Sequence, residues 1–327
     1  MRRILLAIGT CIPLAVVALT ATPAFAEGAR YAVIIQGASG EPQYAKLHRG
    51  WVDSLAGVFR SRFHLDADKL IVLTEEPTAK EQRGTAENVR AVMTRLAKET
   101  KSDDLVFVML IGHGTGDAAA AKFNLVGPDL STDDWNALLK PIAARIAFVD
   151  STSSSFPFLA AVAGPNRVVI TATNSYAQRF HTVFPDAFIQ ALTSPEADAD
   201  KNGRISVLEA FMQASRLVDL HYEQDGHMAT EHAMLDDSGD GKGRDAANAG
   251  GDGAIAALTY LDVVAAPTSS DPEVQKLLLR QQTLTEQVDD LRRRRASMSA
   301  EDFDREFEKL IVDLALVSRD VRRKTAK

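Results

Sequence analysis

Two short segments of the sequence carry side chains that could support acyl transfer. In "LVFVMLIGHGTGD", residues 105 to 117, His113 follows an apolar run and stands among three glycines. In "RIAFVDSTSSSFPFL", residues 145 to 159, an apolar run ends at Asp150, and five hydroxyl side chains follow at positions 151 to 155. An imidazole can activate a neighbouring hydroxyl as a nucleophile, but hydroxyls also bond to the backbone where a strand ends. The pattern therefore allows a hydrolase site or a purely structural turn.

The first 26 residues have the features of a signal peptide. Arg2 and Arg3 precede an apolar stretch, and Ala24-Phe25-Ala26 offers the small-x-small pattern of a cleavage site. We expect cleavage after Ala26 and export, most simply to the periplasm, with secretion as the alternative. No later segment is long and apolar enough for a membrane span, so we expect no transmembrane segment in the mature chain.

Cysteine chemistry is excluded for the mature chain that this cleavage would produce. Cys11 is the one cysteine in the sequence, and it lies inside the predicted signal peptide. Disulfides, thiolate metal sites and a cysteine nucleophile are therefore all excluded downstream of Ala26.

An acidic segment, "DADKNGRISVLE" at residues 198 to 209, fits the template of an EF-hand-like calcium loop. Gly203 stands at the sharp turn, and Ile205 is the apolar anchor. Alternating oxygens followed by an acid one turn into a helix suit a hard cation. We therefore predict a Ca²⁺ site, the alternative being an acidic turn before a helix. Its ligands would be Asp198, Asp200, Asn202, the carbonyl of Arg204, Ser206 and Glu209.

Two further groups could be taken for metal sites. "DDSGDGKG", residues 236 to 243, supplies the first half of a similar loop, but Ala247 stands where the closing acid is needed. Weak metal binding and a simple turn are equally consistent with this half-site. His221, His227 and His232 have a spacing that suits no common zinc motif, and we interpret them as exposed or core histidines.

The sequence pattern predicts that alternating strands and helices position the candidate site residues. Between the strands, helices are expected at 44–63, with Leu47, Trp51, Leu55 and Val58 on its inner face, and at 85–101 and 132–139. This alternation predicts an α/β domain with a mostly parallel sheet and helices on both of its faces. Apolar runs rich in β-branched residues predict strands at 31–36, 70–73, 105–111, 146–149 and 168–173.

The C-terminal part predicts a separate helical hairpin. Residues 265–270 resemble a linker, and Asp271 followed by Pro272 is suited to start a helix. Apolar positions spaced by four and three then run through 277–291 and again through 303–321, which predicts an antiparallel coiled-coil hairpin. The predicted organisation is therefore a signal peptide (1–26), an α/β domain (27–264), a linker (265–270) and a hairpin (271–327).

The charge balance bears on the class of partner. Residues 27–270 contain 22 basic and 32 acidic residues, a net charge of −10, and residues 271–327 contain 13 and 12, a net charge of +1. An acidic body argues against nucleic acid as a partner and favours cations.

Taken together, these motifs resemble the caspase–legumain clan of cysteine peptidases over residues 31 to 240. The resemblance includes "VIIQGASGEPQY", "IGHGTGD", "FVDST", "RVVITATNS", "ADADKNGRISVLEAF" and "TEHAMLDDSGDG". It implies a three-layer caspase-like domain with the two catalytic positions at the ends of adjacent parallel strands. It also implies that His113 matches the family's histidine and Thr152 its cysteine, with Ser153 as an off-by-one alternative.

The sequence departs from the family at the nucleophile, because a threonine hydroxyl is far weaker than a thiol. Three functions remain open. The protein is a pseudopeptidase that binds or scaffolds a protein or peptide partner in the cell envelope, or a hydrolase that uses Thr152 or a neighbouring serine with His113. In the third, residues 271–327 mediate self-association or docking.

Overall fold

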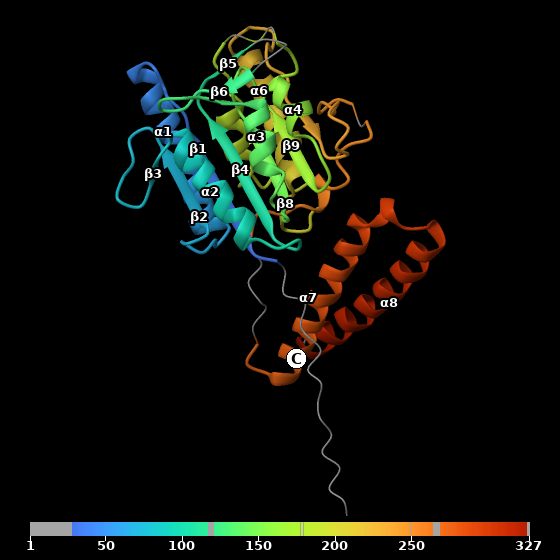
Figure 1. Ribbon diagram of the computed structural model, residues 1–327. Helices are drawn as coiled ribbons and strands as arrows, with labels where there is room; N and C mark the ends of the chain where they lie inside the picture. Colours follow the sequence, from blue (N-terminus) through green and yellow to red (C-terminus); the bar gives the residue numbers. More distant parts are fainter. Residues whose placement is uncertain are drawn as a thin grey trace, which may run out of the picture.

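The computed structural model describes residues 28–116, 121–176, 178, 180–248, 250–263 and 269–325. A seven-stranded sheet lies between helices on both faces, and two long helices follow it (Figure 1). A π-helical turn (Val58–Arg62) extends the first helix, and two 3-10 turns lie at Ala256–Leu258 and Arg295–Ser297. The strands and α-helices, in chain order, are β1 (Arg30–Gln36), α1 (Pro42–Gly57), β2 (Leu70–Thr74), β3 (Gln82–Arg83), α2 (Ala86–Glu99), β4 (Leu105–Ile111), β5 (Gly114–Gly116), β6 (Ala121–Phe123), β7 (Leu130–Ser131), α3 (Thr132–Leu139), β8 (Arg145–Asp150), α4 (Phe156–Val162), β9 (Arg167–Thr171), α5 (Phe184–Ala191), α6 (Val207–Gln224), β10 (Met234–Asp236), α7 (Pro272–Arg293) and α8 (Ala300–Thr325).

The main sheet has the strand order β10-β9-β8-β4-β1-β2-β3. Its strands are parallel except β10, which pairs with β9 in the antiparallel direction. A small antiparallel sheet of β5, β6 and β7 lies beside the carboxyl end of β4. Because β1 and β4 are neighbours while the chain leaves β1 toward β2, the strand order reverses between β1 and β4. Crevices at such reversal points are where open α/β sheets bind ligands.

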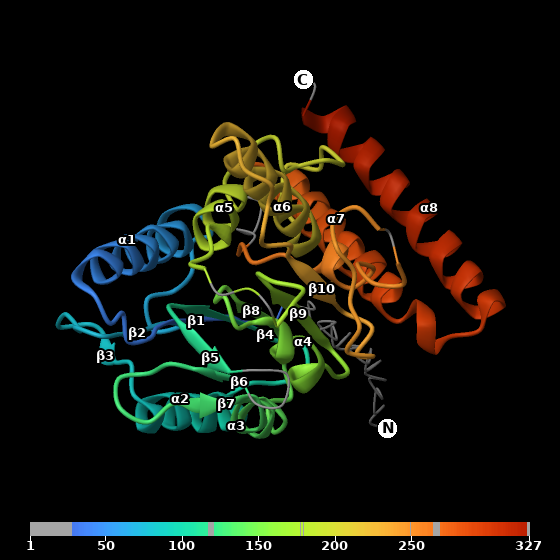
Figure 2. The same ribbon diagram turned by 90° about the horizontal axis from the view of Figure 1, so that it is seen from above.

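Two apolar cores explain the three layers. Alternate residues of the central strands point to opposite faces, so β1 gives Ala32 and Ile34 to one core and Val33 and Ile35 to the other. The first core is closed by α1, α5 and α6, and the second by α2, α3 and α4 (Figure 2). All seven residues of β4 are buried, as expected for a central strand that is covered on both sides.

The predicted fold class is confirmed: three layers, a mostly parallel sheet and a C-terminal antiparallel helical hairpin. Each of the five predicted strands is present within two residues of its predicted ends. The inner face predicted for the first helix was partly wrong. Leu47 is exposed, and the buried face of α1 is formed by His48, Trp51, Val52, Leu55 and Ala56.

The hairpin begins as the sequence predicts. The Asp271 carboxylate accepts hydrogen bonds from the backbone amides of Glu273 and Val274, at 2.8 and 3.3 Å, and so caps α7. The two helices pack against each other in opposite directions, and Gln281 Nε2 donates to Ser318 Oγ at 2.9 Å across them. Figure 1 shows the pair beside the α/β body.

Several predictions fall outside the described residues. They are the signal peptide at residues 1–26, its cleavage site after Ala26, and most of the predicted linker, residues 265–268. Within the described residues, no helix combines the length and the apolar character that a membrane span requires.

Candidate functional site

His113 lies at the reversal point of the sheet. It follows β4, and its Nε2 atom lies 3.2 Å from the backbone carbonyl oxygen of Ser39, which follows β1. The two strand ends are tied directly, since the Gly37 amide donates to the Ile111 carbonyl at 2.9 Å. Gly112 has a φ of +150°, a conformation that a β-carbon would strain, and this lets the chain turn between β4 and His113. The imidazole is therefore fixed to backbone at the carboxyl edge of the sheet.

Thr152 follows the end of β8, the strand next to β4, where the resemblance to the peptidase clan implies the nucleophile. Its side chain is completely buried. Its backbone amide donates to Asp150 Oδ1 at 2.9 Å. Its hydroxyl has no hydrogen-bond partner of good geometry among the described residues. A β-carbon built on Gly114 would lie 2.7 Å from this hydroxyl, so the chain directly after His113 covers it. A hydroxyl in this position is closed off from a substrate.

Asp150 is the one carboxyl group immediately beside Thr152 in the chain, and it is also fully buried. Its Oδ2 atom has no hydrogen-bond partner among the described residues. Burial raises the pKa of Asp150 to about 7, although the hydrogen bond from the Thr152 backbone amide favours the carboxylate. Neither carboxyl oxygen of Asp150 is hydrogen-bonded to the Thr152 hydroxyl, and a base must be within hydrogen-bond reach of the proton that it removes.

The other hydroxyls of the run divide into two kinds. Ser151 Oγ donates to the Leu110 carbonyl at 2.5 Å, and Ser155 Oγ lies 3.0 Å from Thr173 Oγ1. Both are buried and tie β8 to the strands on either side of it. Ser153 and Ser154 are half-buried. Much of the hydroxyl run therefore satisfies the backbone at the strand end.

A cluster of aromatic side chains surrounds His113, and sequence reasoning missed most of it. The ring centroid of His48 lies 5.1 Å from that of His113 and 6.0 Å from that of His181, and His113 and His181 are 6.4 Å apart. Tyr44 meets His113 edge-on at 4.8 Å, and Trp51 stacks on His181 at 5.3 Å. The spacing of Tyr44, His48 and Trp51 by four and three is the signal that places them on one face of α1.

Burial lowers the pKa of two histidines of this cluster. His48 is fully buried, and its Nδ1 atom lies 3.2 Å from Ser39 Oγ. Burial, followed by the nearby His113 and His181, lowers the pKa of His48 to about 3. Burial and the neighbouring His113 also lower the pKa of His181. These histidines form an apolar, neutral wall beside His113.

Glu231 holds the segment that carries His181. Its Oε1 and Oε2 atoms accept hydrogen bonds from the backbone amides of Val183 and Phe184, at 2.8 and 3.4 Å, and so cap α5. Burial raises the pKa of Glu231 to about 7, against the opposing effect of these amides. The predicted family segment at residues 230–241 thus contributes a buried acid that orders one wall of the site.

The predicted calcium ligands converge at the loop before α6. The carboxylates of Asp198, Asp200 and Glu209 each offer an oxygen within 4.8 Å of the others. Gly203 has a φ of +85°, as the sharp turn requires, and its amide donates to Asp198 Oδ2 at 3.0 Å. Glu209 Oε1 accepts from the amides of Ala199 and Asp200, which holds this acid over the loop. Three carboxylates gathered by a tight backbone loop suit a hard divalent cation.

The remaining predicted ligands have other bonds as well. Ser206 caps α6 and forms a reciprocal pair with Glu209: its hydroxyl accepts from the Glu209 amide, and Glu209 Oε2 accepts from the Ser206 amide. Asn202 Oδ1 accepts from the Arg204 amide at 2.8 Å. Ile205 packs on the core below, as expected for the anchor of such a loop.

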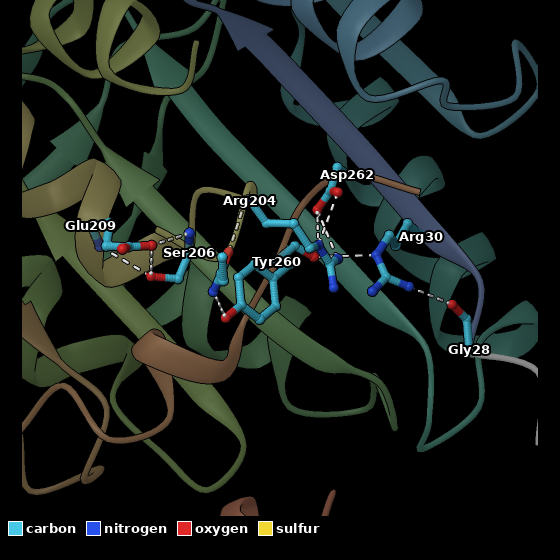
Figure 3. A network of polar contacts seen from close by, with 8 residues as sticks. Gly28, Arg30, Arg204, Ser206, Glu209, Tyr260 and Asp262 are labelled. Carbon is cyan, nitrogen blue, oxygen red and sulfur yellow. Dashed lines mark hydrogen bonds and ion pairs between the residues drawn. The ribbon is translucent and has the colours of Figure 1, made fainter. Parts of the chain in front are cut away.

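The loop is fastened to the start of β1 through residues 259–262. Arg204 pairs with Asp262 at 2.8 Å and lies over the ring of Tyr260, 4.0 Å from its centroid. Asn202 Nδ2 donates to the Tyr260 hydroxyl at 3.1 Å, and Arg30 Nε donates to the Tyr260 carbonyl at 3.2 Å. Figure 3 shows this chain of contacts from Glu209 to Gly28. The conformation of the loop is therefore linked to the edge where the central strands begin.

The second acidic loop is closed by a residue that sequence reasoning missed. Asp236, Asp240 and Asp252 offer carboxylate oxygens within 4.8 Å of one another. Asp252 Oδ1 accepts from the amides of Asp237 and Ser238, at 3.0 and 2.8 Å. Asp252, sixteen residues after Asp236, thus supplies the closing acid that the sequence lacks at Ala247. His221, His227 and His232 are all exposed, which is one of the two environments expected for them.

The fold of this chain is similar to those of several solved structures. No protein-family model matches the sequence, and no curated protein matches it. A protein from Geobacter sulfurreducens of known crystal structure aligns with 58% of this chain and 89% of its own, at 14% identity and a TM-score of 0.38. The Drosophila initiator caspase Dronc aligns with 66% of this chain and 81% of its own, at 10% identity and a TM-score of 0.41. Functional inference therefore rests on the residues of this chain.

Proposed function

We propose that this protein is a caspase–legumain-like pseudopeptidase that binds a peptide or protein partner instead of cleaving it. The observation that carries the proposal is the burial of Thr152, whose hydroxyl lies beneath Gly114 with no exposed surface. A nucleophile must reach a carbonyl carbon at about 3 to 3.5 Å in a near-attack geometry, and a covered hydroxyl cannot do so.

The groups around Thr152 support the same conclusion. Activation of a hydroxyl needs a base within hydrogen-bond reach. Nε2 of His113 donates to the Ser39 carbonyl, which leaves Nδ1 as the nitrogen that could accept a proton, and the Thr152 hydroxyl is not hydrogen-bonded to it. Asp150 Oδ1 accepts from the Thr152 backbone amide, and neither oxygen of Asp150 is hydrogen-bonded to the Thr152 hydroxyl. Neither group is arranged to remove the proton from Thr152.

A hydrolase that uses Ser153 or Ser154 is the competing proposal. Both serines are half-buried, so they are more accessible than Thr152. Reaction of either one with His113 as base requires its hydroxyl to come within hydrogen-bond reach of Nδ1, because Nε2 donates to the Ser39 carbonyl. The experiment below separates this proposal from the pseudopeptidase.

The test combines activity probes with matched variants. The chain from Glu27 onward is expected to leave peptide substrates intact and to resist a fluorophosphonate, which labels activated serines and threonines. Thr152→Cys supplies the sulfur of the family, and Thr152→Ser, which keeps a hydroxyl, is the matched control. Turnover by the unmodified protein that is lost in His113→Ala and also in Thr152→Ala, Ser153→Ala or Ser154→Ala would show an active hydrolase.

The binding half of the proposal has its own measurement. A fluorescent peptide library is titrated with the protein, and saturable binding is expected from some members. Ser154→Leu, which adds bulk at a half-buried position next to Gly114, should weaken that binding. If no peptide binds, or if binding is unchanged in a folded Ser154→Leu variant, the cleft is not a peptide site.

We propose further that Ca²⁺ stabilises the fold through the loop at residues 198–209. Three converging carboxylates and a left-handed glycine support this proposal. Without a cation, the negative charges of Asp198, Asp200 and Glu209 repel one another where α6 begins. The proposed location is the cell envelope after export, and amino-terminal sequencing of the protein from a periplasmic extract should begin at Glu27.

A further inference from the structure

Helix α8 has two apolar faces, and only one of them meets α7. The inner face contains the predicted stripe from Phe303 to Val321, and its residues are half-buried. A second group, Ile311, Val312 and Leu316, is 36, 51 and 45% exposed. In both ribbon views α8 lies on the side of the hairpin away from the α/β body (Figures 1 and 2). The outer face of α8 is thus apolar at its centre and open to solvent.

The outer face has the spacing of a helix-packing seam. Its residues alternate by four and three along the whole helix, which is the repeat that brings one line of side chains against a second helix. Apolar side chains occupy the middle of this line, and charged ones occupy both ends. The seam consists of Glu301, Arg305, Glu308, Val312, Ala315, Arg319 and Arg322.

The charges on α8 point to a particular partner. Residues 300–311 contain five acidic and two basic residues, whereas residues 314–325 contain four basic and one acidic. A helix that is negative in its first half and positive in its second is complementary to a reversed copy of itself. Side by side in the same direction, two copies would bring like charges together.

We propose that the outer face of α8 binds the same face of a second copy of this chain, with the two α8 helices antiparallel. Two hairpins joined in this way form a layer of four helices with the two α8 helices at its centre. In the register that centres the apolar residues, Val312 faces the partner's Ala315, and Ile311 and Leu316 lie on the two flanks of this contact. Glu308 then faces the partner's Arg319, and the two-fold axis repeats each pair.

The flanking charges suit this register with one exception. Asp302 and Arg323 lie on the same flank of the seam, so the antiparallel arrangement brings each Asp302 near the partner's Arg323. Arg305 falls opposite the partner's Arg322, but Asp302 already pairs with Arg305 within its own helix. With 26 residues at about 1.5 Å each, α8 spans roughly 39 Å, long enough for several turns of contact. Because only the central residues are apolar, we expect an association of moderate strength.

The experiment measures the mass of the chain from Glu27 onward by sedimentation at several concentrations. The unmodified protein is expected to be a dimer at roughly 100 μM and to dissociate on dilution, as a contact of this size predicts. Val312→Glu with Leu316→Glu should give monomers. Leu279→Glu, which changes an equally exposed leucine on α7, should leave the dimer intact.

Charge reversal tests the register and does not depend on the apolar core. Glu308→Arg and Arg319→Glu should each be monomeric alone, because each places like charges opposite one another. A one-to-one mixture of the two variants should dimerise, since both cross pairs are then attractive. If the unmodified chain is a monomer at every concentration, or if the mixture stays monomeric while the unmodified chain dimerises, the proposed interface is wrong.

Discussion

The hydroxyl of Thr152 packs against the backbone of Gly114: a β-carbon at Gly114 would lie only 2.7 Å from Thr152 Oγ1. This contact joins the ends of the adjacent strands β4 and β8, which supply the histidine and the nucleophile position of the proposed family. It places the glycine beside His113 over the hydroxyl, and so makes the glycine a packing requirement as well as a turn.

Gly114→Ala should therefore destabilise the protein by about 1 to 3 kcal/mol, as expected for overpacking a buried site. The added methyl group would meet Thr152 Oγ1 and, at 2.9 Å, the β-carbon of Ser154. Gly50→Ala is the matched control. Gly50 lies inside α1 with nothing within 4 Å of a new β-carbon, so this change should stabilise by about 0.5 to 1 kcal/mol. Urea unfolding of both variants checks the sign of each change.

Asp150→Asn should alter how stability depends on pH. The folded-state pKa of Asp150, about 7, lies above the ordinary value of 3.8, so the folded chain keeps a proton that the unfolded chain loses. Asp150 therefore costs stability progressively as the pH rises from 4 to 7. Relative to the unmodified protein, Asp150→Asn should gain about 2 to 3 kcal/mol between pH 5 and pH 8. Urea unfolding at the two pH values measures this, and Asp219→Asn on the exposed face of α6 should show no such trend.

His48→Gln should change how stability depends on pH in the opposite sense, because burial lowers the pKa of His48. The folded-state pKa of His48, about 3, lies below the ordinary 6.5, so the unfolded chain binds a proton that the folded chain does not. The free energy of unfolding therefore falls as the pH drops below 6.5. For one such group the loss between pH 7 and pH 5 is about 2 kcal/mol. His48→Gln should reduce this loss, whereas His227→Gln at an exposed position should not; equal losses in all three proteins would contradict the burial argument.

Calcium should raise the melting temperature by a few degrees. For a site with a dissociation constant of 0.1 to 1 mM, roughly 2 mM Ca²⁺ stabilises by about 0.6 to 1.8 kcal/mol. Mg²⁺ should do less, because it requires a smaller octahedral site. Thermal melts in EDTA, Ca²⁺ and Mg²⁺ should show the shift in the unmodified protein and in Asp219→Ala. The shift should be lost in Asp198→Ala and Glu209→Gln. If all proteins melt at the same temperature in all three buffers, the loop is an acidic turn that does not bind Ca²⁺.

Removal of residues 271–327 should leave a folded α/β body. Neither of the two apolar cores includes a residue from α7 or α8, and these helices pack mainly against each other. The body should therefore keep a cooperative thermal transition by circular dichroism. A chain that ends at Ser270 and shows no transition would place the hairpin within the core of the fold.

The sequence by itself determined the class of fold and the local geometry of the loops. Continuous apolar runs predict central strands, because a strand covered on both faces has no polar side. The spacing by four and three predicts α7 and α8, and the order of oxygens in residues 198–209 predicts a loop whose acids converge. These are local patterns, and each is set by neighbours a few residues apart.

Only the tertiary structure decided what stands around His113. Thr152 is covered by Gly114, and Ser39, His48 and His181 arrive from three other segments of the chain. Asp252 closes the second acidic loop from sixteen residues beyond Asp236, and Leu47 is exposed because α1 is rotated to bury His48. The burial of a side chain and the pKa of its titratable group depend on which segments pack together across the sheet. The spacing of residues along one helix or strand does not specify that packing.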